Sequence, residues 1–201
     1  MTLRAIFFDL GGVILRTEYQ APREQLAERL NMTYEDISKI VFESGTARQA
    51  SLGEISVEQH WQAVAHKLRL PASQAESIRT EFFAGDVIDR DLLAFVRSLR
   101  PRFKTGVISN AWGDMRAYVV KNQFDDAFDT LTISAELGVM KPQPEIYQLA
   151  LKKAQVEAKE AAFVDDTLEN VEAANALGMH GIVFRDPGQV RENLIALLNH
   201  R

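Results

Sequence analysis

Residues 5–15 read AIFFDLGGVIL, and this stretch decides the fold class. A continuous apolar run from Ala5 to Phe8 stops at Asp9, and two glycines follow before the chain becomes apolar again. An uninterrupted apolar run that ends in a glycine-rich turn is typical of a strand buried on both faces, as in a parallel sheet. We therefore predict a buried strand here rather than a signal peptide, because no cleavage site of small residues follows the run.

The rest of the chain divides into a helical part and an alternating part. From Pro22 to Phe83 the apolar periodicity is helical, with no convincing strand. After Asp91 short strands alternate with helices. The expected strands are residues 105–108, 129–134, 161–164 and 181–184. This alternation predicts an α/β fold, a three-layer α/β/α Rossmann-like core with a parallel sheet. We expect residues 1–17 and 85–201 to form the core and residues 18–84 to form an inserted helical subdomain.

Composition excludes several classes of function. The 201 residues carry a net charge of −5, with 23 basic and 28 acidic side chains, which argues against a nucleic-acid surface. The chain has no cysteine, so a disulfide framework, a thiolate zinc site and a cysteine nucleophile are excluded. No apolar stretch is long enough to cross a bilayer. We expect a cytoplasmic monomer or homodimer that binds neither nucleic acid nor membrane.

Polar residues stand at the ends of three expected strands. They are Asp9, the pair Ser109-Asn110 and the pair Asp165-Asp166. In an open parallel sheet, ligands bind in the crevice outside the carboxyl ends of the strands, so these residues should converge. Each of them alone is as well explained as a helix cap, a position that Asp, Ser and Asn favour. Three strands that end in this way favour a functional site.

Four segments combine a strand end or turn with polar residues, and they are Phe8-Asp9-Leu10-Gly11-Gly12-Val13, Ile108-Ser109-Asn110, Leu137-Gly138-Val139-Met140-Lys141-Pro142 with Pro144, and Val164-Asp165-Asp166-Thr167 with Asn170. In this order they resemble the four motifs of the haloacid-dehalogenase-like hydrolase superfamily. The resemblance covers essentially the whole chain, and the helical stretch between the first two motifs resembles the helical cap of subfamily I. The chain is also similar to small sugar-phosphate phosphatases and to the phosphatase domain of soluble epoxide hydrolases.

This resemblance implies a magnesium-dependent phosphatase that acts on a small phosphorylated metabolite, such as a sugar phosphate. A carboxylate can attack phosphorus and divide one difficult step into two, and the meeting of two anions requires positive charge. By resemblance, Asp9 is the nucleophile and Lys141 supplies charge. Ser109, Lys141 and the backbone amide of Asn110 would hold the phosphate.

The implied Mg²⁺ ligands are Asp9, the carbonyl of Gly11 and Asp166, with Asp165 outside the first shell or bound through water. Oxygen ligands of this kind are those that magnesium prefers. Asn170 would orient Lys141.

Gly11 departs from the family pattern, in which phosphatases usually carry a second aspartate that protonates the leaving group. Three interpretations remain open. The substrates could have good leaving groups, another acid such as Asp114 or Glu18 could replace the aspartate, or the protein could be a 2-haloacid dehalogenase with an ester intermediate on Asp9. A catalytically weak phospho-ligand binding protein is a further alternative. The pair Asp165-Asp166 favours phosphate chemistry, because dehalogenases need no magnesium.

Overall fold

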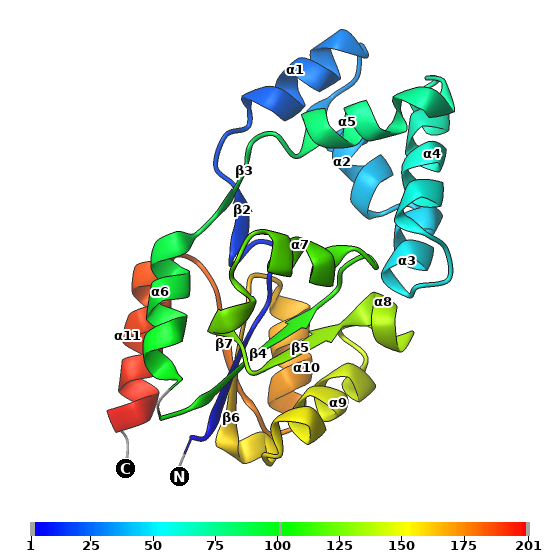
Figure 1. Cartoon of the computed structure of the whole chain (residues 1–201). Coiled ribbons are helices and arrows are strands. Elements are labelled where there is room, and N and C mark those ends of the chain that lie inside the picture. Colours follow the sequence, from blue (N-terminus) through cyan, green and yellow to red (C-terminus); the bar gives the residue numbers. More distant parts are fainter. Residues whose placement is uncertain (1–2, 101, 200–201) are drawn as a thin grey trace.

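The computed structural model describes residues 3–100 and 102–199, which form a five-stranded parallel sheet with helices on both faces (Figure 1). The strand order is β5-β4-β1-β6-β7, and all four pairings are parallel. The strands are β1 Ala5–Phe8, β4 Lys104–Ser109, β5 Thr130–Ile133, β6 Ala161–Asp165 and β7 His180–Val183. The predicted α/β fold class is therefore confirmed.

The register of the central strand β1 places the polar strand ends side by side. Phe8, the last residue of β1, pairs with Val107 of β4 on one side and with Val164 of β6 on the other. Asp9 continues this alignment, since its backbone N–H donates to the carbonyl of Val164 at 2.9 Å. All four residues of β1 are buried because both faces of the sheet are covered, which explains the uninterrupted apolar run.

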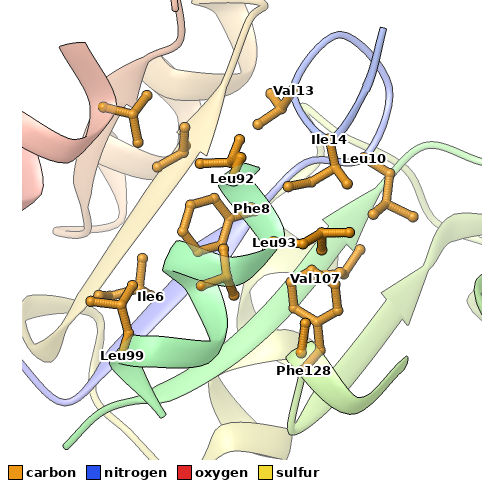
Figure 2. Packing of buried hydrophobic residues seen from close by; sticks show 14 of the residues in the cluster. Ile6, Phe8, Leu10, Val13, Ile14, Leu92, Leu93, Leu99, Val107 and Phe128 are labelled. Carbon is orange, nitrogen blue, oxygen red and sulfur yellow. The ribbon is translucent and has the colours of Figure 1, made fainter. Parts of the chain in front are cut away.

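Helices pack on each face of the sheet. The first face carries α6 Arg90–Leu99, α7 Met115–Lys121 and α11 Pro187–Asn199, and the second carries α9 Pro144–Ala154 and α10 Leu168–Ala176. Figure 2 shows the first of these interiors, where Ile6 and Phe8 meet Leu92, Leu93 and Leu99 of α6. The apolar residues of α6 recur at helical spacing, and the Asp89 side chain caps its first turn by accepting from the N–H of Leu92.

A two-stranded antiparallel ribbon rises from the edge of the sheet where the site lies. It consists of β2 Leu15–Thr17 and β3 Asp86–Ile88. We did not predict this ribbon from the sequence. Each strand has only three residues, none of them fully buried, so neither produces an apolar pattern. The ribbon carries the chain out of the core after β1 and back before α6.

Residues 18–84, which we call the helical insertion, lie between β2 and β3 and contain helices and turns only (Figure 1). Its helices are α1 Ala21–Arg29, α2 Tyr34–Phe42, α3 Gly45–Ser51, α4 Val57–Lys67 and α5 Ala75–Phe82. A short 3-10 helix, Ala72–Gln74, precedes α5, and two others, Asp125–Ala127 and Ala158–Glu160, belong to the core. Capping boxes at Thr33 and Ser56 start α2 and α4. The insertion has its own buried cluster around Trp61 and Phe82.

Among residues 3–100 and 102–199, no helix is both long and apolar enough to cross a membrane.

Candidate active site

Lys141 and two aspartates form a buried charge cluster at the carboxyl edge of the sheet. The short helix α8, Ser134–Leu137, follows β5, and Lys141 lies in the irregular segment between α8 and α9. Its Nζ is 2.8 Å from Oδ2 of Asp9 and 2.6 Å from Oδ2 of Asp165. The strand ends β1 and β6 thus hold the two carboxylates on either side of one ammonium group.

This lysine is almost completely removed from water, with 1% of its side chain exposed. Taking an ammonium group out of water is costly, and here two carboxylates in hydrogen-bond range offset the cost. The Nζ of Lys141 also lies over the Phe163 ring, 5.4 Å from the ring centroid. The segment therefore holds a fixed positive charge against Asp9.

Asp9 lies at the centre of the site. Its Oδ1 accepts from the backbone N–H of Leu10 at 2.7 Å, while Oδ2 faces Lys141. The combined surroundings of Asp9 raise its pKa to about 6: burial raises it most, the neighbouring ammonium of Lys141 lowers it, and the Asp165 carboxylate raises it. A hydrogen bond with Ser109 also lowers this pKa. Ser109 itself is buried at the end of β4, the strand next to β1 in the sheet.

Asp165 is fully buried and accepts hydrogen bonds from three residues. Its Oδ2 accepts from Lys141, its Oδ1 accepts from the backbone N–H of Thr167 at 2.8 Å, and Asn170 donates to both oxygens at 3.1 and 3.2 Å. Asn170 therefore contacts the carboxylate that holds Lys141, rather than Lys141 itself. The orienting role that we predict for Asn170 would therefore act through Asp165.

Asp9, Asp165 and Asp166 each bring a carboxylate oxygen within 4.8 Å of the other two, an arrangement able to hold a metal ion. The Asp166 residue as a whole is exposed. Burial of part of its side chain raises its pKa, and the negative charge of Asp165 raises this pKa further. A side chain at Gly12 would collide with the Asp166 carboxylate, so this glycine makes room for it. Carboxylate oxygens are the hard ligands that Mg²⁺ prefers, and the residues of this cluster fit that ion.

Asn110 has a side-chain role that the sequence did not indicate. Its Nδ2 donates to the carbonyl of Lys141 at 2.9 Å, and its Oδ1 accepts from the N–H of Lys141 at 2.7 Å. We had assigned only its backbone amide, to the phosphate. No sequence signal links the two residues, because they are 31 positions apart and belong to different loops.

Gly11 lies in the turn after Asp9, and the two adjacent glycines differ in their surroundings. Gly12 has the left-handed φ of 73°, whereas Gly11 does not have a positive φ, and a Cβ added there would meet nothing within 4 Å. The absence of an acid at position 11 is therefore not imposed by the backbone.

Both acids that we considered as substitutes form ion pairs. Asp114 forms an ion pair with Arg79 of α5, and Glu18 forms one with Arg16 at 3.0 Å. Asp114 does line a cavity of about 490 Å³, within the range of small-molecule sites, between the helical insertion and the core. The lining residues are Leu15, Glu76, Arg79, Thr80, Phe83, Asp86, Trp112, Asp114, Met115, Ala117, Tyr118 and Lys121.

Comparison with known proteins gives both partial and full-length relatives. Bifunctional epoxide hydrolase 2 of Rattus norvegicus is 25% identical over 96% of this chain, which spans 38% of that protein's length. D-ribitol-5-phosphate phosphatase of Bacteroides thetaiotaomicron is 22% identical, with 98% of this chain and 99% of that protein covered.

A solved structure shares the fold. It is a HAD family enzyme of Bacteroides thetaiotaomicron in complex with magnesium and inorganic phosphate, with a TM-score of 0.77 and 22% identity over 91% of this chain and 94% of that one. The model of the haloacid dehalogenase-like hydrolase family matches residues 3–178, a span that includes β1, all three aspartates and Lys141. The chain therefore belongs to the haloacid dehalogenase-like hydrolase family.

Proposed function

We propose that this protein is a magnesium-dependent phosphatase that hydrolyses a small phosphorylated metabolite through a covalent phosphoryl group on Asp9. The observation that carries the proposal is the buried ammonium of Lys141 between Asp9 and Asp165, beside the exposed carboxylate of Asp166. Attack of a carboxylate on a phosphate brings two anions together, and this site holds positive charge where they would meet.

In the first step an oxygen of Asp9 forms a bond to phosphorus, and the bond from phosphorus to the substrate oxygen breaks. The leaving oxygen departs with the electron pair and takes a proton from solvent or from the substrate's own surroundings. In the second step water attacks phosphorus, the acyl phosphate bond breaks, and Asp9 returns as a carboxylate. Lys141 would stabilise the negative charge on the phosphoryl oxygens in both steps, and Ser109 would donate to one of them.

Bound Mg²⁺ would neutralise charge on the phosphate and position it for in-line attack. Asp9, Asp166 and the carbonyl of Gly11 would hold the ion. Asp165 would remain outside this shell, because its oxygens already accept from Lys141, Thr167 and Asn170.

We also propose that residues 18–84 act as a cap that closes over the site and selects the organic part of the substrate. The cavity between the helical insertion and the core is the candidate location for that part. Trp112 lines it and is three residues from Ser109, so the two Cα atoms are separated by at most about 11 Å. The relative that acts on D-ribitol 5-phosphate supports a sugar-phosphate-like substrate.

Gly11 favours one alternative, the 2-haloacid dehalogenase, in which Asp9 would form an ester by displacing a halide. That reaction needs no general acid at position 11. It also needs no metal, and it gives no role to the exposed Asp166 carboxylate that Gly12 accommodates.

A screen of phosphorylated metabolites with and without Mg²⁺ tests the proposal, with Asp9→Asn as the blank. We expect phosphate release that requires both Asp9 and the metal. Rapid acid quenching and mass analysis should detect a phosphoryl adduct on the Asp9 peptide. Phosphate release that persists in Asp9→Asn would contradict the assignment of the nucleophile.

A further inference from the structure

The main chain of Lys141 is held by one side chain. Its N–H and its C=O have no other hydrogen-bond partner among the described residues, and both bond to the amide of Asn110. The segment from Gly138 to Gln143 belongs to no helix or strand, so no regular ladder fixes it. Two bonds from one planar amide, one to each of the peptide groups that flank the Lys141 Cα, restrict both displacement of this residue and rotation of its backbone.

The backbone on both sides of Asn110 is itself fixed by other contacts. Ala111, the next residue, donates its N–H to Oγ of Ser134 at 3.0 Å, and Ser134 donates its hydroxyl to the carbonyl of Ala111 at 3.2 Å. Ser134 is fully buried and directly follows β5. On the other side of Asn110, Ser109 belongs to the β4 ladder and pairs with Ile133. The Asn110 side chain therefore projects from backbone that two neighbouring strands hold in place.

A long lysine side chain reaches a defined point only if its main chain is fixed. Nζ of Lys141 must stay within hydrogen-bond range of Asp9 and Asp165 at once, and a shift of the segment would break that arrangement. We propose that Asn110 is a positioning residue, whose side-chain amide clamps the Lys141 main chain and so fixes the ammonium group against Asp9. This inference rests on the proposed function only for its effect on turnover.

The test measures position and catalysis separately. The rate at which an amine-reactive reagent labels Lys141 is determined by mass analysis of its peptide, without substrate, and turnover of a substrate from the screen is measured in parallel. Asn110→Ala removes both bonds, and Asn110→Asp keeps the acceptor for the Lys141 N–H but loses the donor. Asn175→Ala is the matched control, since it removes a side-chain bond to the Gly181 main chain elsewhere in the core. Labelling of Lys153 reports general loosening.

We expect faster labelling of Lys141 in Asn110→Ala, an intermediate rate in Asn110→Asp and no change in Asn175→Ala. Turnover should fall by on the order of 10²-fold in Asn110→Ala, the cost of a displacement of about 1 Å in a catalytic group. Unchanged Lys141 labelling with reduced turnover would overturn the proposal, because Asn110 would then act on the phosphate directly. Faster labelling with unchanged turnover would confirm the clamp and contradict the catalytic role of Lys141. If Asn110→Ala labels every lysine faster, Asn110→Asp decides.

Discussion

The core and the helical insertion have interiors of different chemistry. At the edge of the core sheet, charge is buried, with Lys141 held by directional bonds to Asp9 and Asp165. The interior of the insertion is aromatic and is held by non-directional packing around Trp61 and Phe82. Directional bonds fix reacting groups to a fraction of an ångström, whereas apolar packing allows a helical layer to shift as a body. The chemistry is accordingly expected in the core and the selection of substrates at the insertion.

Contacts between these regions include two from the loop after β4. Trp112 inserts into the aromatic cluster, with ring centroids 4.7 Å from His60 and 5.8 Å from Trp61. Asp114, two residues later, pairs with Arg79 of α5. The same loop follows Ser109, the last residue of β4, whose hydroxyl lowers the pKa of Asp9. We therefore expect a movement of the insertion to shift the segment that we assign to phosphate binding.

The largest effect is expected when the charge cluster of the core is broken. Lys141→Met leaves two buried carboxylates without their cation, and breaking a buried pair in this way costs about 3–5 kcal/mol. We expect the free energy of unfolding, measured by urea denaturation without divalent metal, to fall by that amount. Lys153→Met is the control, because Lys153 bonds only the Leu131 carbonyl near the surface. Equal stability of Lys141→Met and wild type would show that the cluster does not stabilise the core.

The two adjacent glycines separate chemistry from structure. Gly11→Asp should fold normally, since its Cβ meets no neighbour, and should supply the missing general acid, an effect of about 10²-fold or more. Gly12→Asp should not fold normally, because the new side chain would collide with Asp166 and the φ angle at this position is left-handed. The measurement is a plot of log rate against leaving-group pKa. We expect a steep wild-type plot and the greatest gain in Gly11→Asp for alkyl phosphates. A flat wild-type plot would mean that another acid already acts.

A change at the junction should affect the insertion more than the sheet. Trp112→Ala removes a half-buried ring from the aromatic cluster, with an expected cost of about 2 kcal/mol, below the 3–5 for a fully buried aromatic residue. Hydrogen exchange should become faster in α4 and α5 but remain slow in β1. KM should rise more than kcat falls. Trp112→Phe, which keeps most of the packing, should behave nearly as wild type. Faster exchange in β1 would indicate that the two regions unfold together.

The smallest effect is expected inside the insertion, from His60. Burial lowers the pKa of His60, nearby Lys67 lowers it further, and the carbonyl of Val41 raises it. The unfolded chain, with a histidine pKa of about 6.5, then binds more protons than the folded chain at acidic pH. The contribution of His60 to the free energy of unfolding is therefore fully present above about pH 6.5, the pKa in the unfolded chain, and is lost as the pH falls through the lower pKa of the folded chain. The dependence of the free energy of unfolding on pH should become weaker in His60→Gln. It should stay as in wild type in His66→Gln, since His66 is exposed. An unchanged slope in His60→Gln would contradict this.

The sequence allowed prediction of what the sheet dictates. Strand ends at Asp9, Ser109 and Asp165 follow from apolar runs that stop at polar residues, and the parallel register brings them together. The ribbon β2–β3 could not be predicted, since two three-residue strands 69 positions apart stabilise each other only in the folded chain. The Asn110–Lys141 clamp was missed for the same reason. Both features depend on pairs of residues whose proximity only the fold creates.

The central claim is that Asp9 attacks phosphorus, and one measurement tests it most directly. The enzyme, in excess over substrate, completes a single turnover in water enriched in heavy oxygen, and the Asp9 peptide and the released product are then analysed by mass. Water that attacks phosphorus leaves the label in inorganic phosphate and none in Asp9, which is the result we predict. In a parallel single turnover with a 2-haloacid as substrate, label in Asp9 with halide released and no dependence on metal would show that water attacks the carbonyl carbon of an ester and would contradict the phosphatase assignment.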